Sequence, residues 1–477
     1  MGNISIEYGD IALTAKDDLT ASASSKQSFS KLALLKQNNV AYKKYATFEQ
    51  NFCVLDGSFK NFPDDPSLEN FALWSALMSN SSGNFSTPIT LTCDFASYIT
   101  SVGLTIYFST ATNDYAKNVN VKWYRDSTLL SDEDYTVNNA VYFCENTVER
   151  FNKVVITFQK TNNPYRYLKI EDIIWGTGRT FDENVLREVN LLEDVSLTSE
   201  EIRINTLDFT LSNKQDVAFT FQKTQPLKFT RNNELLGVFF IDSAVRKSKT
   251  IWELKTVDYI GVLDKIPFDG GTYSNVTVST LISTILGNRI PYNLNSSLAN
   301  ITLSGTLEKC SKREALLQVA FAICAIVDCS RSESINIYPA SSTVVSNIEE
   351  GIYDGQTFET EDEVTEIRIK LNNDTVVSKR NPYLPSDVYD NVLEFEGVFI
   401  NSSNANTVLN FLYDYYVTNK NKTAKMRIPV NNGEKVGDVI TYYSEEEENK
   451  KGRISQMEFG FNSNKLVAKA EVKELEV

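Results

Sequence analysis

The chain is rich in carboxylates but contains no histidine, and this combination limits the chemistry it can perform. The pair Asp132/Asp134 and the run Glu361–Glu363 offer the two carboxylates that a glycosidase needs. With 62 acidic residues among 477, such pairs are expected by chance, so we interpret them as solvated loop charge. The lack of histidine excludes Ser-His-Asp and Cys-His nucleophile arrangements and removes the commonest metal ligand.

Thiols do not replace histidine as metal ligands in this sequence, because no two cysteines form a C-x₂-C pair. There is also no P-loop, no G-x-G-x-x-G, no H-E-x-x-H and no EF-hand spacing. We expect the six cysteines to be free and structural: Cys53, Cys93, Cys144, Cys310, Cys324 and Cys329. The sequence therefore predicts a protein that is not an enzyme and that carries no metal and no cofactor.

Aromatic side chains offer a different chemistry, because their flat apolar faces can stack on sugars. Trp74, Tyr115, Trp123 and Tyr124 are the residues to consider. Trp123 and Tyr124 are adjacent in an expected strand and point to opposite faces, so at least one of them should lie in a core. We predict carbohydrate binding by Trp74, Tyr115 and Trp123, with burial as the alternative for each of them.

The composition indicates a mostly β, multidomain protein. Hydrophobic residues make up 42% and charged residues 23%, and 27 Phe and 23 Tyr favour pleated strands. The net charge of −15 is unsuited to nucleic acids and to anionic membranes. No apolar run reaches the roughly 18 residues of a membrane span, and the N-terminus does not resemble a signal peptide. We therefore expect synthesis in a cytoplasm and no membrane partner.

Residues 46–176 carry closely spaced strand signals separated by turn residues, a pattern typical of a sandwich or jelly roll. We read this segment as an insertion into a first β domain formed by residues 1–45 and 177–270. An α/β domain over 271–345 follows, with helices expected at Ser279–Leu286 and after Ser311. Residues 346–424 are expected to form a second β region with a helix at Ala405–Thr418, and 425–477 a C-terminal β domain.

The inserted segment resembles galactose-binding-like, or discoidin-type, modules. The residues that carry this resemblance are Leu55–Gly57, Leu73–Ser75, Phe85–Leu91, Gly103–Phe108 and Arg166–Trp175. The resemblance implies a jelly roll whose loops at one end often bind glycans. Calcium near Asp56 and Gly57 is an alternative to a plain turn there, although a turn is the preferred interpretation.

The rest of the chain resembles the tail-hub, or baseplate-hub, proteins of long-tailed phages and related prophage particles. The matching segments, in order, are Glu188–Val195, Thr206–Asn213, Gln225–Leu227, Leu236–Ile241, Thr256–Tyr259, Cys310–Ile323, Ile335–Pro339, Lys435–Ile440 and Lys451–Ile454. The resemblance implies a ring, usually a homotrimer, in which each subunit presents two barrel domains like those of the tail tube. Its implied partners are the tail tube, the spike and other baseplate proteins of the virion or phage-tail-like particle.

Three hypotheses follow from these patterns. The favoured one is a structural hub that joins the tail tube to the spike or tail tip, with residues 177–270 and 340–400 as the paired tube-like regions. The second is an adhesin whose inserted module binds cell-wall polysaccharide. The third, a wall-degrading enzyme, is disfavoured by the missing histidine and by the lack of a convincing acid pair.

Overall fold

The structure is a computed structural model, and the chain divides into two compact units. The described residues are 3–12, 14–36, 45–46, 49, 60–61, 72–110, 112–213, 219, 221, 223, 225–287, 290–348, 354–360, 362–371, 374–385, 390–419, 422–430, 433–443, 449–461 and 467–475. Unit 1 comprises Met1–Tyr8, Thr180–Asp216 and Pro226–Val477. Unit 2 comprises Gly9–Arg179 and Val217–Gln225.

The boundaries of unit 2 differ from the predicted insertion at 46–176. Strand β2 (Leu19–Ala23) pairs with Leu91–Phe95 of the long strand β6 (Asn84–Phe108), so the chain joins unit 2 well before residue 46. Strand β1 (Ile4–Ile11) crosses the boundary, and its first part pairs in unit 1 with β14 (Pro226–Arg231). The sequence offered no composition change near residue 9 to mark this point. The three subdivisions predicted beyond residue 270 all fall within unit 1.

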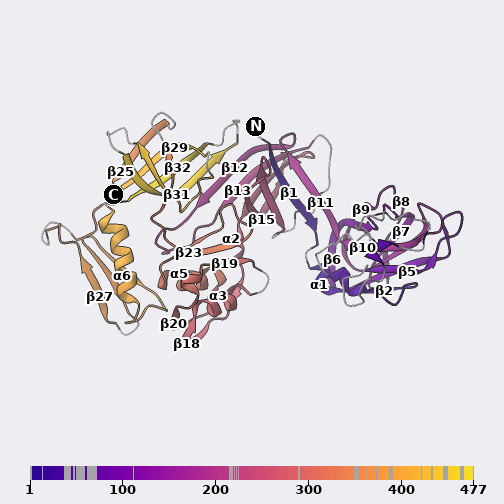
Figure 1. Ribbon diagram of the computed structural model, residues 1–477, viewed down its shortest axis with the longest axis horizontal. Helices are drawn as coiled ribbons and strands as arrows, with labels where there is room; N and C mark the ends of the chain where they lie inside the picture. The colour runs from indigo at the N-terminus through magenta and orange to yellow at the C-terminus, as the bar shows by residue number, and fades with distance from the viewer. Residues whose placement is uncertain are drawn as a thin grey trace. The chain divides into compact units, whose positions relative to one another are not determined.

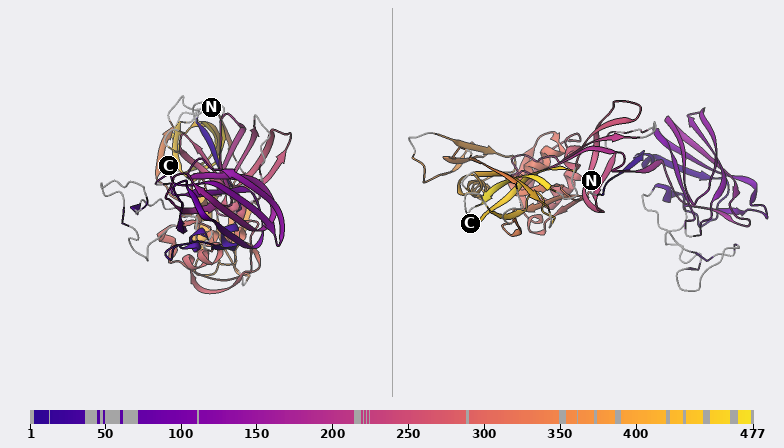
Figure 2. Two further views of the ribbon diagram at one scale, coloured as in Figure 1. Left: turned by 90° about the vertical axis from the view of Figure 1, so that its right-hand side faces the viewer. Right: turned by 90° about the horizontal axis from the view of Figure 1, so that it is seen from above.

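Unit 2 is built on one antiparallel sheet of seven described strands, ordered β5-β10-β6-β9-β7-β8 with β2 on β6. Besides β2 and β6, its strands are β5 (Leu73–Met78), β7 (Ala116–Arg125), β8 (Thr128–Thr136), β9 (Val141–Thr161) and β10 (Tyr167–Ile174). The short elements of the unit are α1 (Ala15–Asp18), a 3₁₀ helix (Leu32–Lys36), β3 (Tyr45–Ala46) and β4 (Lys60–Asn61). Figure 2 shows how strongly these purple strands curve.

Strands β6 and β9 each span two strand patterns of the sequence, Ile89–Thr92 with Gly103–Phe108 and Val141–Phe143 with Lys153–Phe158. Their mutual register shifts three times between Asp94 and Gly103, and such bulges let one strand bend without ending. The first half of β6 therefore pairs with β2, and its last residues pair with β10. Unit 2 is the β-rich body that was expected for this segment, while its closure as a jelly roll stays a prediction.

Most of the strands of unit 1 belong to one large sheet of thirteen described strands (Figure 1). Its strand order is β11-β1-β14-β15-β16-β13-β12-β31-β32-β29-β25, with β30 on β31 and β24 on β30. The bounds are β11 (Gly176–Asp182), β12 (Leu186–Asp194), β13 (Thr206–Ser212), β15 (Glu234–Arg246), β16 (Ile251–Val257), β24 (Val344–Ile348), β25 (Asp354–Thr360), β29 (Lys422–Pro429), β30 (Val439–Tyr443), β31 (Asn449–Gly460) and β32 (Val467–Leu475).

The turn residues Arg231-Asn232-Asn233-Glu234 between two strand patterns predict a hairpin, and the pairing of β14 with β15 confirms it. Asn232 and Asn233 turn the chain with φ of 50° and 66°, the left-handed values that a tight two-residue turn requires. Asparagine tolerates this conformation better than most residues, because its short side chain bonds locally.

A helical module follows the first strands of unit 1. It contains α2 (Tyr259–Leu263), β17 (Pro267–Phe268), β18 (Gly271–Thr277), α3 (Val278–Leu286), β19 (Tyr292–Leu294), α4 (Ser296–Ala299), β20 (Thr302–Leu307), β21 (Cys310–Ser311), α5 (Lys312–Ala322), β22 (Ala325–Asp328) and β23 (Ile335–Pro339). The predicted cap at Ser311 is present, and its hydroxyl accepts a hydrogen bond from the Glu314 amide at 3.1 Å. Helices α3 and α5 lie against each other (Figure 1), and their apolar side chains are buried in one core.

A small sheet completes unit 1, ordered β27-β26-β28 and covered on one face by α6. The elements are β26 (Glu366–Lys370), β27 (Val376–Arg380), β28 (Val392–Glu396), α6 (Ala405–Tyr413) and a π-helical turn (Asp414–Thr418). Ile367 and Ile369 of β26 and Val408 and Leu412 of α6 are buried between them. The helix expected at Ala405–Thr418 is confirmed, with its last turn widened.

Candidate functional site

Trp123 lies in the centre of the core of unit 2. Its side chain is fully buried, with ring centroids 4.6 Å from Phe151 and 6.3 Å from Trp175. Its neighbour Tyr124 lies on the other face of β7 and is half-buried, as the alternation predicted. A ring enclosed in this way presents no face to a sugar. Of the two alternatives for Trp123, sugar binding or burial, the structure shows burial.

Trp74 also lies inside unit 2, with 4% of its surface exposed. Its ring packs edge-on against Phe29 at 5.7 Å and lies near Tyr167. The Lys169 ammonium lies 4.8 Å from the centre of the ring, where the negative face of the indole attracts a cation. In this structure the ring face of Trp74 is occupied by a lysine rather than open to a ligand.

Lys169 belongs to a buried charge cluster, defined here as Lys169, Glu49, Asp114 and Arg166. The Lys169 ammonium donates to the Glu49 carboxylate and lies 4.0 Å from an Asp114 oxygen. The other Asp114 oxygen accepts from Arg166 Nε at 3.1 Å. Glu49 also accepts from the backbone N–H of Tyr167 at 2.6 Å. Two cations and two anions thus compensate each other at a site with little water, where an unpaired charge is costly.

Tyr115 follows Asp114 directly and is half-buried against the core of unit 2. Its backbone N–H donates to Asn162 Oδ1 at 3.1 Å, and its carbonyl accepts from the Asn162 N–H at 2.9 Å. The charge cluster therefore brings Trp74 and the turn at Tyr115 into one neighbourhood, while Trp123 lies elsewhere in the core. Among the three predicted residues, Tyr115 has the most accessible side chain.

The predicted acid pair Asp132/Asp134 lies on the exposed face of β8. Asn120 Nδ2 donates to both carboxylates, at 2.8 Å and 3.1 Å, and Lys122 lies 3.0 Å from Asp132. Hydrogen bonds from Asn120 and Lys122 lower the pKa of Asp132. Asp132 is therefore ionised at neutral pH and is not arranged as the proton donor that a glycosidase needs.

Several other predicted features have simple outcomes. Cys93, Cys144 and Cys329 are free and buried, and Cys310 and Cys324 are free and partly exposed. Burial raises the pKa of Cys144 to about 12, so this thiol is unreactive. Within the described part of the chain, no group of three or more acids or thiols is placed to hold a metal ion. Asp56–Gly57, Cys53 and Glu361 lie outside the described residues.

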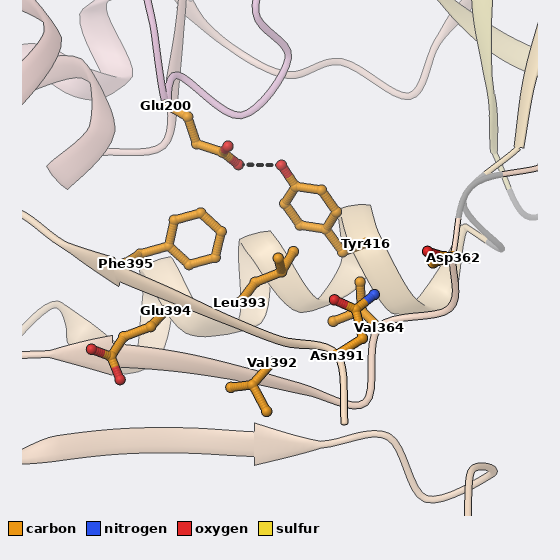
Figure 3. A pocket seen from close by; sticks show the side chains of 9 residues that line it. All are labelled: Glu200, Asp362, Val364, Asn391, Val392, Leu393, Glu394, Phe395 and Tyr416. Carbon is orange, nitrogen blue, oxygen red and sulfur yellow. Dashed lines mark hydrogen bonds between the residues drawn. The ribbon is translucent and has the colours of Figure 1, made fainter. Parts of the chain in front are cut away.

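A hollow of about 360 Å³ lies beside β28 in unit 1 (Figure 3). Leu393 and Phe395 point into it, toward Tyr416 of the π-helical turn and Glu200, while Val392 and Glu394 point away. The Tyr416 hydroxyl donates to the Glu200 carboxylate. Burial and the nearby Glu200 charge raise the pKa of Tyr416. The hollow therefore has apolar walls with carboxylates at its rim, and the sequence patterns did not predict it.

A second buried group of charges lies in unit 1, where the first strands, the helical module and the C-terminal strands meet. Glu193 of β12 is fully buried and receives two hydrogen bonds from Arg331, at 3.0 Å and 3.3 Å. Burial raises the pKa of Glu193 and of Asp328, and it raises that of Asp258 to about 7. One signal for this buried charge group is present in the sequence. Glu193 lies two residues after Leu191 in β12, so both side chains point to the buried face of the strand.

Comparison with known proteins gave matches only among solved structures, since no family model and no curated protein matches. A tail protein from Neisseria meningitidis MC58 has a TM-score of 0.49 and 11% identity, covering 61% of this chain and 95% of that one. The 43 kDa tail protein of prophage MuSo2 from Shewanella oneidensis has a TM-score of 0.46 and 12% identity, covering 62% and 94%. Prophage tail protein gp18 from Listeria monocytogenes EGD-e has a TM-score of 0.44 and 8% identity, covering 61% and 91%.

These values are too low to assign a role to any residue of this chain. What the structure itself establishes is a mostly β protein with several sheets and a few helices. Among the described helices, none has the length and apolar character that a membrane crossing requires.

Proposed function

We propose that this chain is a structural hub of a phage tail or phage-tail-like particle, joining the tail tube to the spike or tail tip. The observation that carries the proposal is the pairing of β12 with β31, in register from Asn190 opposite Gly460 to Asp194 opposite Gln456. These two strands contain the first and the last segments of the tail-hub resemblance. Segments more than 250 residues apart in sequence, in the order typical of hubs, thus form one continuous sheet.

The two β regions of this sheet supply the pair of tube-like elements that the proposal needs. The first consists of β1 and β11–β16, much as the sequence predicted for 177–270. The second is not drawn from 340–400 alone, because β24 and β25 are completed by β29–β32 from the end of the chain. Residues 362–419 form the small sheet with α6 instead. Three copies with two such regions each would match a six-fold tube.

The position of the helical module also supports a scaffolding role. Its core is continuous with the small sheet and α6, so three parts of unit 1 share one apolar interior. Packed interiors of this kind hold strands in fixed relation and transmit strain. We therefore propose that unit 1 is the load-carrying connector, with the tail tube, the spike and other baseplate proteins as partners and the virion or tail particle as its location.

The test is the copy number and position of the subunit in purified particles. Quantitative mass measurement should give three copies per particle, and imaging of particles labelled on unit 2 should place the label at the junction of tube and tip. A hexameric ring, or label spread along the tube, would exclude the hub role.

Glycan binding by unit 2 is the second candidate, and Tyr115 is the residue that favours it. Its half-exposed ring lies in a turn tied to Asn162, as a loop contact for a sugar requires. Binding of the intact protein to a cell-wall polysaccharide array, compared between wild type and Tyr115→Ala, tests this role. Equal binding by both proteins would remove Tyr115 from it, and adsorption of assembled particles provides the second readout.

A further inference from the structure

The small sheet of unit 1 has two edge strands of opposite charge. Within the described part of the chain, β27 and β28 each pair only with the central strand β26. Strand β27 reads Val-Val-Ser-Lys-Arg and strand β28 reads Val-Leu-Glu-Phe-Glu. Edge strands present unpaired backbone groups, and natural proteins usually protect them or use them for pairing.

The charges on both edges lie on the face of the sheet that is turned away from α6. Glu394 and Glu396 of β28 are exposed there, and so is Arg380 of β27. On the central strand, Arg368 lies opposite Glu394, and Glu366 lies opposite Arg380. Charge therefore alternates across this face, with a cation at one edge and anions at the other.

We propose that β27 of one copy of this chain pairs with β28 of a second copy, continuing the sheet from subunit to subunit. This inference rests on the proposed hub function, since it names the contact that would build the ring. Arg380 of one copy then lies next to Glu394 and Glu396 of its neighbour, which extends the alternation seen within each sheet.

Strand direction suits this arrangement. Strand β26 is parallel to β28 and antiparallel to β27. When copies keep the same orientation along the strands, β28 runs antiparallel to the β27 of the next copy, repeating the β26–β27 relation and giving the better hydrogen-bond geometry. The contact uses different surfaces on the two partners, so it is head-to-tail and forms a closed ring when the rotation between copies closes.

The hollow beside β28 accommodates the other face of the incoming strand. The apolar walls of the hollow are Leu393 and Phe395, on the side of β28 that faces α6. On β27, Val377 and Lys379 lie on this same side of the sheet. In the continued sheet, the neighbour's Val377 borders these apolar walls, while its Lys379 stays on its own α6, where it donates to Asn410 Oδ1 at 3.0 Å and lies 3.9 Å from the centre of the Tyr413 ring. A second copy therefore offers an apolar side chain that extends the apolar walls of the hollow.

Charge reversal with restoration tests the pairing in the full-length protein. Glu394→Lys alone and Arg380→Glu alone each place like charges across the contact, and each should raise the dissociation constant for self-association about tenfold. The double variant restores opposite charges and should return to within about threefold of wild type. Glu133→Lys, on the exposed edge strand β8 of unit 2, is the matched control and should have no effect. Sedimentation gives the association constants, and unchanged unfolding midpoints confirm folding.

Cysteine cross-linking identifies the contact directly, in solution and in assembled particles. Mixing Glu394→Cys with Arg380→Cys should give a disulfide-linked dimer under oxidation, while either variant alone should give no more than wild type. Rings of three copies that show neither the cross-link nor the charge effects would overturn this pairing and leave the hub function intact. A cross-link from β28 to a different particle protein would also overturn it. If the particle does not contain three copies but the cross-link forms, the hub function is rejected and the pairing is retained.

Discussion

The two units bury charge in different ways. In unit 2, the cations Lys169 and Arg166 face the anions Glu49 and Asp114 at close range. Lys16 and Asp172 form a further buried pair at 2.6 Å. Each of these anions has a cation in contact, so the cost of desolvation is partly offset within the unit, although burial still raises the pKa of Asp172.

Unit 1 buries acids in excess of its cations. Four acids interact where the parts of unit 1 meet: Glu193, Asp258, Asp328 and Asp438. The cations that act on this group are Arg331 and Lys435. One oxygen of Asp328, fully enclosed, has no hydrogen-bond partner among the described residues. The comparison indicates that unit 2 depends on intact ion pairs, whereas burial in unit 1 favours the protonated form of an acid, most clearly at Asp258.

The largest expected effect comes from removing a cation in unit 2. Lys169→Met removes the ammonium that contacts the buried Glu49 carboxylate, and we expect a loss of roughly 3–5 kcal/mol in the free energy of unfolding of unit 2. Three of the four tryptophans lie in this unit, so urea denaturation followed by tryptophan emission reports it.

Two variants sharpen this result. Lys153→Met breaks an exposed pair with Asp94 at 3.7 Å and should cost less than about 1 kcal/mol. Adding Glu49→Gln to Lys169→Met removes the buried carboxylate charge and should recover most of the loss. If Lys169→Met lowers the free energy of unfolding no more than Lys153→Met does, burial is not the reason why the charge cluster contributes to stability.

The next effect is the pH dependence of unit 1. Burial raises the pKa of Asp258 from 3.8 to about 7, against hydrogen bonds from the backbone N–H groups of Gly261 and Asn205. Between these two values the folded state holds a proton that the unfolded chain has lost. The stabilisation is therefore complete below about pH 4 and is lost as the pH rises through 7, by roughly 3 kcal/mol between pH 5 and pH 8.

Unfolding of unit 1 at several pH values, followed by Trp252 emission, measures this slope. Asp258→Asn keeps an acceptor for the Gly261 N–H at the start of α2 and removes the titration, so its slope should be flatter. A stability that rises from pH 5 to pH 8 in the wild type would contradict the assignment of excess protons to unit 1.

Local elements were largely predictable from the sequence because their signals are local. The hairpin at Asn232–Asn233, the cap at Ser311 and the helix from Ala405 each depend on residues a few positions apart. The boundary of unit 2 was not predictable, because it depends on β2 pairing with a strand about 70 residues away. The sequence does not reveal that β6 and β9 each continue through their bulges as one strand, since a bend and a turn leave similar polar signals.

The site residues were harder to predict for a related reason. Composition marks Trp74 and Trp123 as sugar-stacking candidates, but only the tertiary structure shows that both are enclosed. The charge cluster draws Glu49, Asp114 and Lys169 from three separated segments, and no local pattern connects them. The opposite charges of β27 and β28 were visible in the sequence, but their meaning depends on both strands being edges.

A smaller pH effect is expected in unit 2 from Glu171, an acid that has no cation in contact among the described residues. Burial raises the pKa of Glu171 to about 7, while Thr110 donates to it at 3.3 Å and 3.0 Å. The sign is the same as for Asp258, so unit 2 should lose stability as the pH rises toward 7. Glu171 is half-exposed, and solvent screening reduces the expected loss to about 1 kcal/mol between pH 5 and pH 8. Glu171→Gln should abolish this slope in tryptophan emission, and an unchanged slope would assign it to other groups.

The smallest effect on stability is expected at the exposed acid pair of β8, Asp132 and Asp134. This pair completes the comparison because its acids are charged but not buried. Asp132→Asn removes an anion that contacts Lys122 at 3.0 Å and Asn120 at 2.8 Å, yet all three side chains are in contact with water. Water and salt screen such a pair, and the amide can still accept from Asn120. The unfolding midpoint of unit 2 should therefore not change measurably at pH 7, in low or in high salt. Asp134→Asn on the same face is the matched variant and should behave alike. A clear destabilisation by Asp132→Asn alone would mean that this face is covered in the folded protein, and that the contrast between the units is not set by burial.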